Sequence, residues 1–143
     1  MFTTLGAPET TRPKNRACRR IKEGVALYIS IYIFRINKAN VEEHLSIERE
    51  AARIYMEHGA IFNDAYRASR LTGKHGCVGF ADAIDVGEDE EMLVSLTGFK
   101  DQSHHDKTMN KVNSDPKIRE LFARAKKVVA LDRTAYGEFE LIK

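Results

Sequence analysis

A β-branched and aromatic run at residues 25–36 is the clearest hydrophobic pattern in the chain. Ile, Val, Tyr and Phe dominate this run, and these residue types favour a strand over a helix. One alternating register is purely aliphatic, whereas the other holds Tyr28, Ser30, Tyr32 and Phe34. Because both registers are largely apolar, the pattern predicts a strand that is covered on both of its faces.

Residues 40–58 change to a helical period. Apolar and aromatic residues recur there at steps of three and four, and His44 lies on the same side as they do. Asn40 with Glu43 three residues later is typical of a capping box, and Gly59 is typical of a helix end. This stretch therefore predicts one amphipathic helix.

The rest of the chain completes an alternation of strands and helices. It predicts strands at 60–70, 77–83, 91–99 and 134–142 and helices at 103–113 and 115–127, with Ser103 and Asp115 as caps. The main elements follow the order β-α-β-β-α-β, which predicts an α+β fold, a ferredoxin-like sandwich with both helices on one face of the sheet. The other face would then expose one apolar register of residues 25–36. We therefore predict a homodimer that closes a dimeric α/β barrel.

Charge separates the chain into two parts. Residues 1–24 carry six basic and two acidic side chains, whereas residues 25–143 carry 17 basic and 19 acidic ones. This contrast predicts a basic N-terminal arm, 1–24, and one dimeric α/β-barrel domain, 25–143. No aromatic residue lies between the basic residues of the arm, so we expect a solvated arm rather than a nucleic-acid contact.

Four short stretches of the body resemble the YbaA-like family of small proteins of unknown function. They are EHGA at 57–60, DEEMLVSLTGF at 89–99, NSDPKI at 113–118 and DRTAYGEFELI at 132–142. The resemblance covers about residues 25–143 and implies a dimeric α/β barrel. Family members carry a tryptophan after the second strand, but this chain has no Trp, which implies a chemically different loop there.

The candidate ligand contacts are polar or aromatic side chains that a barrel pocket could use. His44 and Tyr66 are the candidate acid/base groups, because proton transfer needs such a side chain near the substrate. The candidate ligand-binding residues are Tyr28, Tyr32, Arg70, His75, Arg133 and Tyr136. The alternatives are that the tyrosines supply apolar area at the dimer contact and that Arg133 forms an intermolecular salt bridge.

The sequence contains no recognisable catalytic or metal-binding motif. His104 and His105 are adjacent and do not face one another on a helix, so we predict no metal site and no cofactor. The two cysteines fit a reducing cytoplasm, and no apolar run approaches the ~20 residues of a membrane helix. We expect a homodimer that binds a small organic molecule in an aromatic pocket. The alternative is a cofactor-independent enzyme of the monooxygenase or isomerase type.

Overall fold

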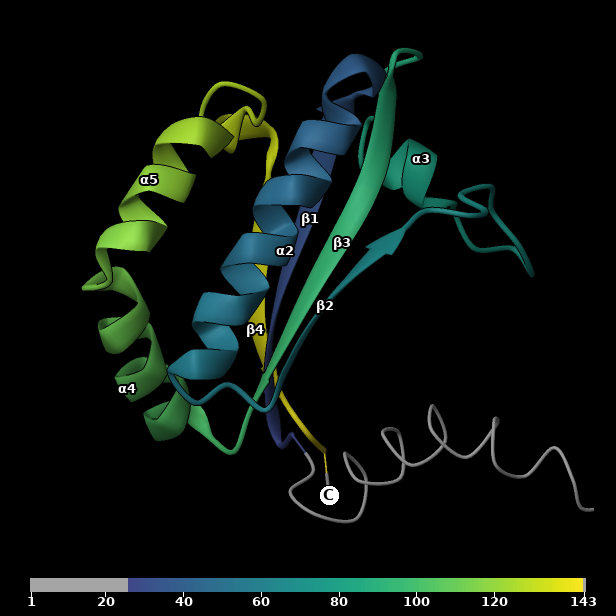
Figure 1. The fold of residues 1–143 in the computed structure, drawn as a ribbon. Helices are drawn as coiled ribbons and strands as arrows, with labels where there is room; N and C mark the ends of the chain where they lie inside the picture. Colours follow the sequence, from purple (N-terminus) through teal and green to yellow (C-terminus); the bar gives the residue numbers. More distant parts are fainter. Residues whose placement is uncertain (1–25, 143) are drawn as a thin grey trace, which may run out of the picture.

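A computed structural model describes residues 26–142, which form one sheet with helices packed against it (Figure 1). The strands are β1 (Tyr28–Asn37), β2 (Phe62–Arg67), β3 (Glu90–Phe99) and β4 (Ala135–Glu140). The helices are η1 (Lys38–Asn40), α2 (Val41–Glu57), α3 (Phe80–Ala83), α4 (Gln102–Asn113), α5 (Pro116–Ala125) and η2 (Leu131–Arg133).

The four strands form an antiparallel sheet in the order β2-β3-β1-β4. Strand β1 pairs with β3 along its whole length and with β4 over its first half, so it lies inside the sheet. Tyr32 is paired with Ser95 on one side and with Tyr136 on the other. The predicted α+β class is therefore confirmed.

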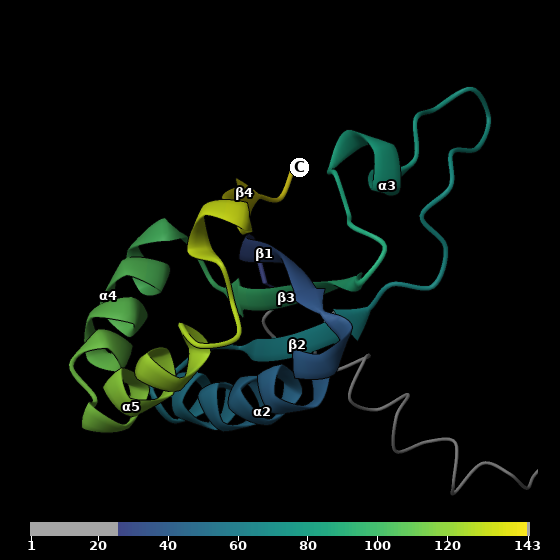
Figure 2. The ribbon, with the colours of Figure 1, turned by 90° about the horizontal axis from the view of Figure 1, so that it is seen from above.

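The two faces of the sheet differ in what covers them. Helices α2, α4 and α5 lie against one face, whereas the short helix α3 lies on the opposite side (Figure 2). The mixed register of β1 faces the long helices: Phe34 packs with Val41 of α2, and Tyr28 packs with Tyr55. Since side chains alternate along a strand, the aliphatic register points to the other face. The tyrosines of β1 therefore do not lie on the open face, where a sheet-to-sheet dimer contact was expected.

The core lies between the sheet and the long helices. Phe99 and Ile36 are fully buried at opposite ends of the sheet. Between the helices, Ile47 and Ile54 of α2 pack with Val112 and Leu121 in a second cluster. The helical period of residues 40–58 therefore marks a face that is buried against both the sheet and the other helices.

Asn40 is the N-cap residue of α2, as predicted, whereas the predicted cap at Ser103 is wrong. Asn40 makes no side-chain capping hydrogen bond, because the chain already turns at η1, where the Asn37 side chain accepts from the Ala39 amide. Helix α4 is capped by Asp101, whose carboxylate accepts from the His104 amide at 2.7 Å, and not by Ser103. The predicted cap at Asp115 is confirmed, since its side chain accepts from the Lys117 amide.

The region between β2 and β3 also differs from the sequence prediction. The expected strand at 77–83 is replaced by α3 and by an isolated bridge between Lys74 and Cys77. Gly79 explains part of this difference, because a Cβ atom there would lie 2.1 Å from the Leu71 carbonyl oxygen. This loop therefore contains a close contact between backbone atoms that only glycine permits, where the sequence predicted a regular strand.

The predicted basic arm, residues 1–24, lies outside the described residues, so its separation from a domain at 25–143 stays a prediction. Within residues 26–142, the helices fall short of the length and apolar character that a bilayer-spanning helix needs.

Candidate functional site

A cavity of about 470 Å³ lies between the sheet and the long helices. Its walls are mainly apolar and aromatic, with Ile47, Met109 and Leu121 lining it from the helices and Phe34 from β1. Most polar residues of the lining come from the sheet and from α2, and Asn113 and Arg119 come from α4 and α5. Those of the sheet and of α2 are Tyr32, Asn63, Ser95, Thr97, His44, Glu48 and Tyr55. Concave, mostly apolar sites with a few polar groups are typical of small-molecule binding.

His44 is the buried polar group of this cavity that lacks a partner. It lies in the first turn of α2, and its side chain is 3% exposed. Within the described part of the chain, neither ring nitrogen has a hydrogen-bond partner. The ring contacts Phe34 edge-on, with the centroids 4.5 Å apart. Burial lowers the pKa of His44 to about 4, so the imidazole is neutral at pH 7.

Glu48 lies one helical turn after His44 and faces the same cavity. Its Oε1 atom is 3.5 Å from His44 Nε2, which is longer than a hydrogen bond. Burial raises the pKa of the Glu48 carboxyl, and a hydrogen bond from Ser95 partly opposes this shift. The site thus combines a neutral imidazole with a carboxyl group whose charged form is disfavoured.

Two tyrosines complete the polar part of the cavity. Burial raises the pKa of both Tyr32 and Tyr55, and the nearby Glu48 carboxylate adds to each shift. Both phenols are therefore protonated at neutral pH. Tyr32 also lies nearly parallel to Phe34, with the ring centroids 5.6 Å apart, so the sheet side of the cavity presents flat aromatic surfaces.

A second polar cluster adjoins the cavity at the β1–β4 edge. The hydroxyls of Tyr28 and Tyr136 each donate to the Glu138 carboxylate at 2.5 Å. The bond to Glu138, together with burial, raises the pKa of Tyr28 to about 12. His105 Nε2 lies 3.7 Å from the same carboxylate. The Tyr136 ring contacts the ring of Tyr32, which lines the cavity, with the two centroids 4.6 Å apart.

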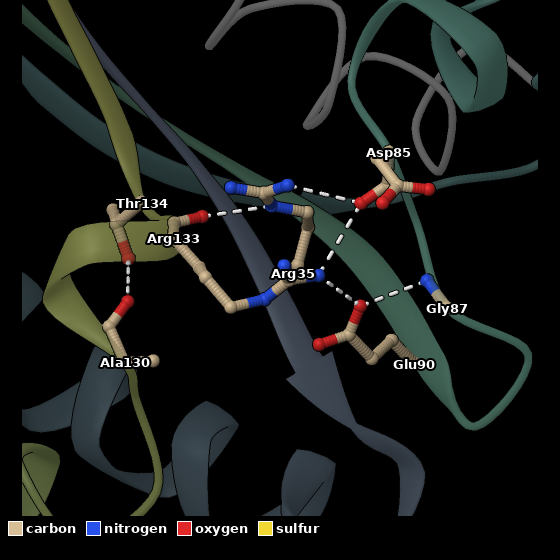
Figure 3. A network of polar contacts seen from close by, with 7 residues as sticks. All are labelled: Arg35, Asp85, Gly87, Glu90, Ala130, Arg133 and Thr134. Carbon is tan, nitrogen blue, oxygen red and sulfur yellow. Dashed lines mark hydrogen bonds and ion pairs between the residues drawn. The ribbon is translucent and has the colours of Figure 1, made fainter.

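Arg133 is engaged within the chain (Figure 3). Its guanidinium donates to Glu90 Oε1 at 2.7 Å and to the Asp85 carbonyl oxygen at 3.3 Å. Arg35 joins the network by donating to the carbonyl oxygens of Arg133 and Asp85. The Gly87 amide donates to the same Glu90 oxygen. These contacts tie the loop before β3 to the sheet, and Arg133 is not among the residues that line the cavity.

The other three predicted site residues also lie outside the cavity lining. Tyr66 is 52% exposed, and its register on β2 points it to the face opposite α2. Arg70 and His75 are exposed in the segment between β2 and α3, which extends away from the helices (Figure 2). Of the predicted residues, the structure therefore brings His44 and Tyr32 into the cavity and Tyr28 and Tyr136 next to it.

Sequence reasoning missed Glu48 and Tyr55. Glu48 follows His44 by four residues and Tyr55 follows Glu48 by seven, and that helical spacing could have placed all three on one side of α2. Ser95 had no comparable signal, because its place opposite Glu48 depends on the pairing of β3 with β1.

Replacement of His44 with leucine should raise the free energy of unfolding at pH 7 by about 1–2 kcal/mol, because a buried side chain with unpartnered nitrogens is removed. The pKa of His44 is about 4 in the folded protein, below its ordinary value of 6.5. The unfolded chain therefore binds the extra proton first, and the wild type loses stability as the pH falls through this window. Urea denaturation of both proteins at pH 7 and pH 5 should show that the difference in their free energies of unfolding is larger at pH 5. A leucine variant that is less stable at both values would contradict this account.

The described fold and cavity define a class of protein: a small α+β domain with an antiparallel sheet, helices on one face and a mainly apolar cavity between the layers. The chain belongs to the DUF1428 family, described as proteins of unknown function, whose model matches residues 27–130. This match confirms a family of unknown function, as the YbaA-like resemblance implied, while the YbaA-like name itself stays a prediction. A comparison with curated proteins found no match.

Two solved structures with 9% sequence identity have a similar fold. Protein Atu4242 from Agrobacterium tumefaciens matches with a TM-score of 0.51, over 81% of this chain and 94% of that one. SnoaB, a cofactor-independent oxygenase from Streptomyces nogalater, matches with a TM-score of 0.51, over 82% of this chain and 96% of that one. At this identity the likeness establishes the ferredoxin-like α+β fold and nothing about the chemistry.

Proposed function

We propose that this protein binds a small organic molecule in the cavity between the sheet and the long helices. The observation that carries the proposal is His44, a buried imidazole that faces the cavity without a hydrogen-bond partner among the described residues. Leaving such a group unpaired costs about 1–3 kcal/mol, so a bound molecule that pairs with it gains from the contact.

A screen of small aromatic compounds by thermal shift tests this proposal. A compound present at 100 times its Kd should stabilise the protein by about 2.7 kcal/mol. Replacement of Ala51 with tryptophan would fill the cavity and should abolish the shift, whereas Ala52, the next residue on α2, lines a surface groove instead. Equal ligand shifts in Ala51→Trp and Ala52→Trp would place the binding elsewhere.

The proposed assembly is a homodimer formed through the open face of the sheet. Ile29, Ile31 and Ile33 are half-buried there in the single chain, and Phe139 is 55% exposed. A second copy supplies a matching apolar face, because a two-fold interface pairs the same surface on both subunits. The alternating aliphatic pattern of β1 supports this arrangement, which would form the dimeric α/β barrel expected from the sequence.

A cofactor-independent enzyme of the isomerase or monooxygenase type is the second candidate. The observation in its favour is the pairing of His44 and Glu48 in a cavity that disfavours charge. A carboxyl group whose pKa is raised by burial is better suited to hold and donate a proton than an exposed one. The cofactor-independent oxygenase SnoaB has a similar fold, which makes this chemistry compatible with such a framework. Turnover that is lost in Glu48→Gln while ligand binding is retained would favour the enzyme over the binding protein.

A further inference from the structure

His44 and Glu48 lie next to each other on the cavity lining without a hydrogen bond between them. Nε2 and Oε1 are 3.5 Å apart, and the imidazole nitrogens have no partner among the described residues. Hydrogen bonds between nitrogen or oxygen atoms are about 2.7–3.0 Å long. An oxygen atom placed beside this pair can lie at that distance from both groups at once. The two side chains can therefore share one hydroxyl group of a ligand.

The charges of the lining favour an uncharged ligand group at this point. Among the described lining residues, Glu48 is the carboxylate and Arg119 is the cation, and Arg119 is exposed at the helix α5 side. An anion beside His44 would face the Glu48 carboxylate, while an ammonium group would have to be desolvated in a mainly apolar cavity. A neutral imidazole carries one donor and one acceptor, and a hydroxyl group has the same two functions.

The aromatic walls favour a flat molecule around that hydroxyl. Phe34 and Tyr32 lie within 11° of parallel on β1, and the Phe34 ring also contacts the His44 ring. Aromatic side chains of this kind pack against planar ligands by stacking or by edge contacts. His44 lies next to Phe34, so one ligand can contact the His44–Glu48 pair and the aromatic wall together.

We propose that the ligand is an uncharged planar molecule with a hydroxyl group, a phenol or an enol, whose oxygen bridges His44 Nε2 and Glu48 Oε1 in the cavity. This inference rests on the proposed binding function and specifies the class of ligand. The hydroxyl donates to the Glu48 carboxylate and accepts from the His44 ring, and the ring system of the ligand lies along Tyr32 and Phe34.

Four probes with one ring system test the proposal by isothermal titration of the full chain. The probes are 2-naphthol, naphthalene, 2-naphthoate and 2-naphthylmethylammonium, which differ only in the polar group. We expect 2-naphthol to bind at least about 10-fold more tightly than naphthalene, and more tightly than either charged probe. His44→Leu and Glu48→Met should each bring the ratio of 2-naphthol to naphthalene affinity close to one.

Glu42→Met is the matched control, because Glu42 lies on α2 with an 84% exposed side chain outside the cavity lining. It should leave the ratio unchanged. If 2-naphthol and naphthalene bind equally, the cavity binds ligands without the hydroxyl bridge, and this inference is wrong while the binding function stands. Tightest binding of the ammonium or the carboxylate probe would also overturn it, in favour of recognition by charge. If no probe binds, the proposed function itself fails.

Discussion

Replacement of Phe99 with alanine is expected to lower the free energy of unfolding by about 3–5 kcal/mol. Phe99 is 0% exposed at the end of β3, where its backbone pairs with Tyr28. The ring packs edge-on against His105 of α4, with the centroids 4.7 Å apart. Removing it would leave a cavity between the sheet and α4 that neighbouring elements, held by backbone pairing, can close only in part.

Urea denaturation followed by circular dichroism measures this loss. Phe122→Ala is the control, because Phe122 is 50% exposed on α5 and should lose much less. Similar losses in the two variants would show that β3 and α4 do not depend on the Phe99 contact.

Replacement of Ile31 with lysine is expected to weaken the proposed dimer by about 100-fold or more. Ile31 lies in the middle of β1, on the face away from the long helices, between Ile29 and Ile33. A two-fold contact would bury two copies of the new charge, and an unpaired buried charge costs several kcal/mol. Since 1.4 kcal/mol corresponds to a factor of ten in affinity, the dimer should dissociate at micromolar concentration.

Sedimentation velocity on the wild type and on Ile31→Lys measures the fraction of dimer in each protein. Met56→Lys is the matched control, since Met56 is 46% exposed on α2, in the helical layer, and its replacement should leave the dimer intact. A wild type that is a monomer at micromolar concentration, or an Ile31→Lys variant that remains a dimer, would refute the proposed assembly.

The main elements of the fold were predictable because their signals are local. The run at 25–36 and the helical period at 40–58 each correspond to one element, β1 and α2. The errors lie where non-local contacts decide. A Cβ atom at Gly79 would lie 2.1 Å from the Leu71 carbonyl oxygen, and the strand predicted at 77–83 does not form.

The candidate site was predictable only in part. His44 was identified from its place on α2, but its isolation from partners depends on what β1 and the helices place around it. Arg133 was expected to contact a ligand, yet its guanidinium donates to Glu90 and to the Asp85 carbonyl oxygen, both more than 40 residues away in sequence. A single charged residue in the sequence carries no information about such a distant partner.

The sequence by itself determined that β1 is a strand with two apolar registers and that α2 is an amphipathic helix, because residue type and period act within one element. Tertiary structure alone decided which register of β1 the helices cover and that His44 and Glu48 meet in a cavity without a hydrogen bond between them. The physical reason is that burial and hydrogen-bond pairing depend on all the elements that meet at one point, and the chain brings those together only when it folds.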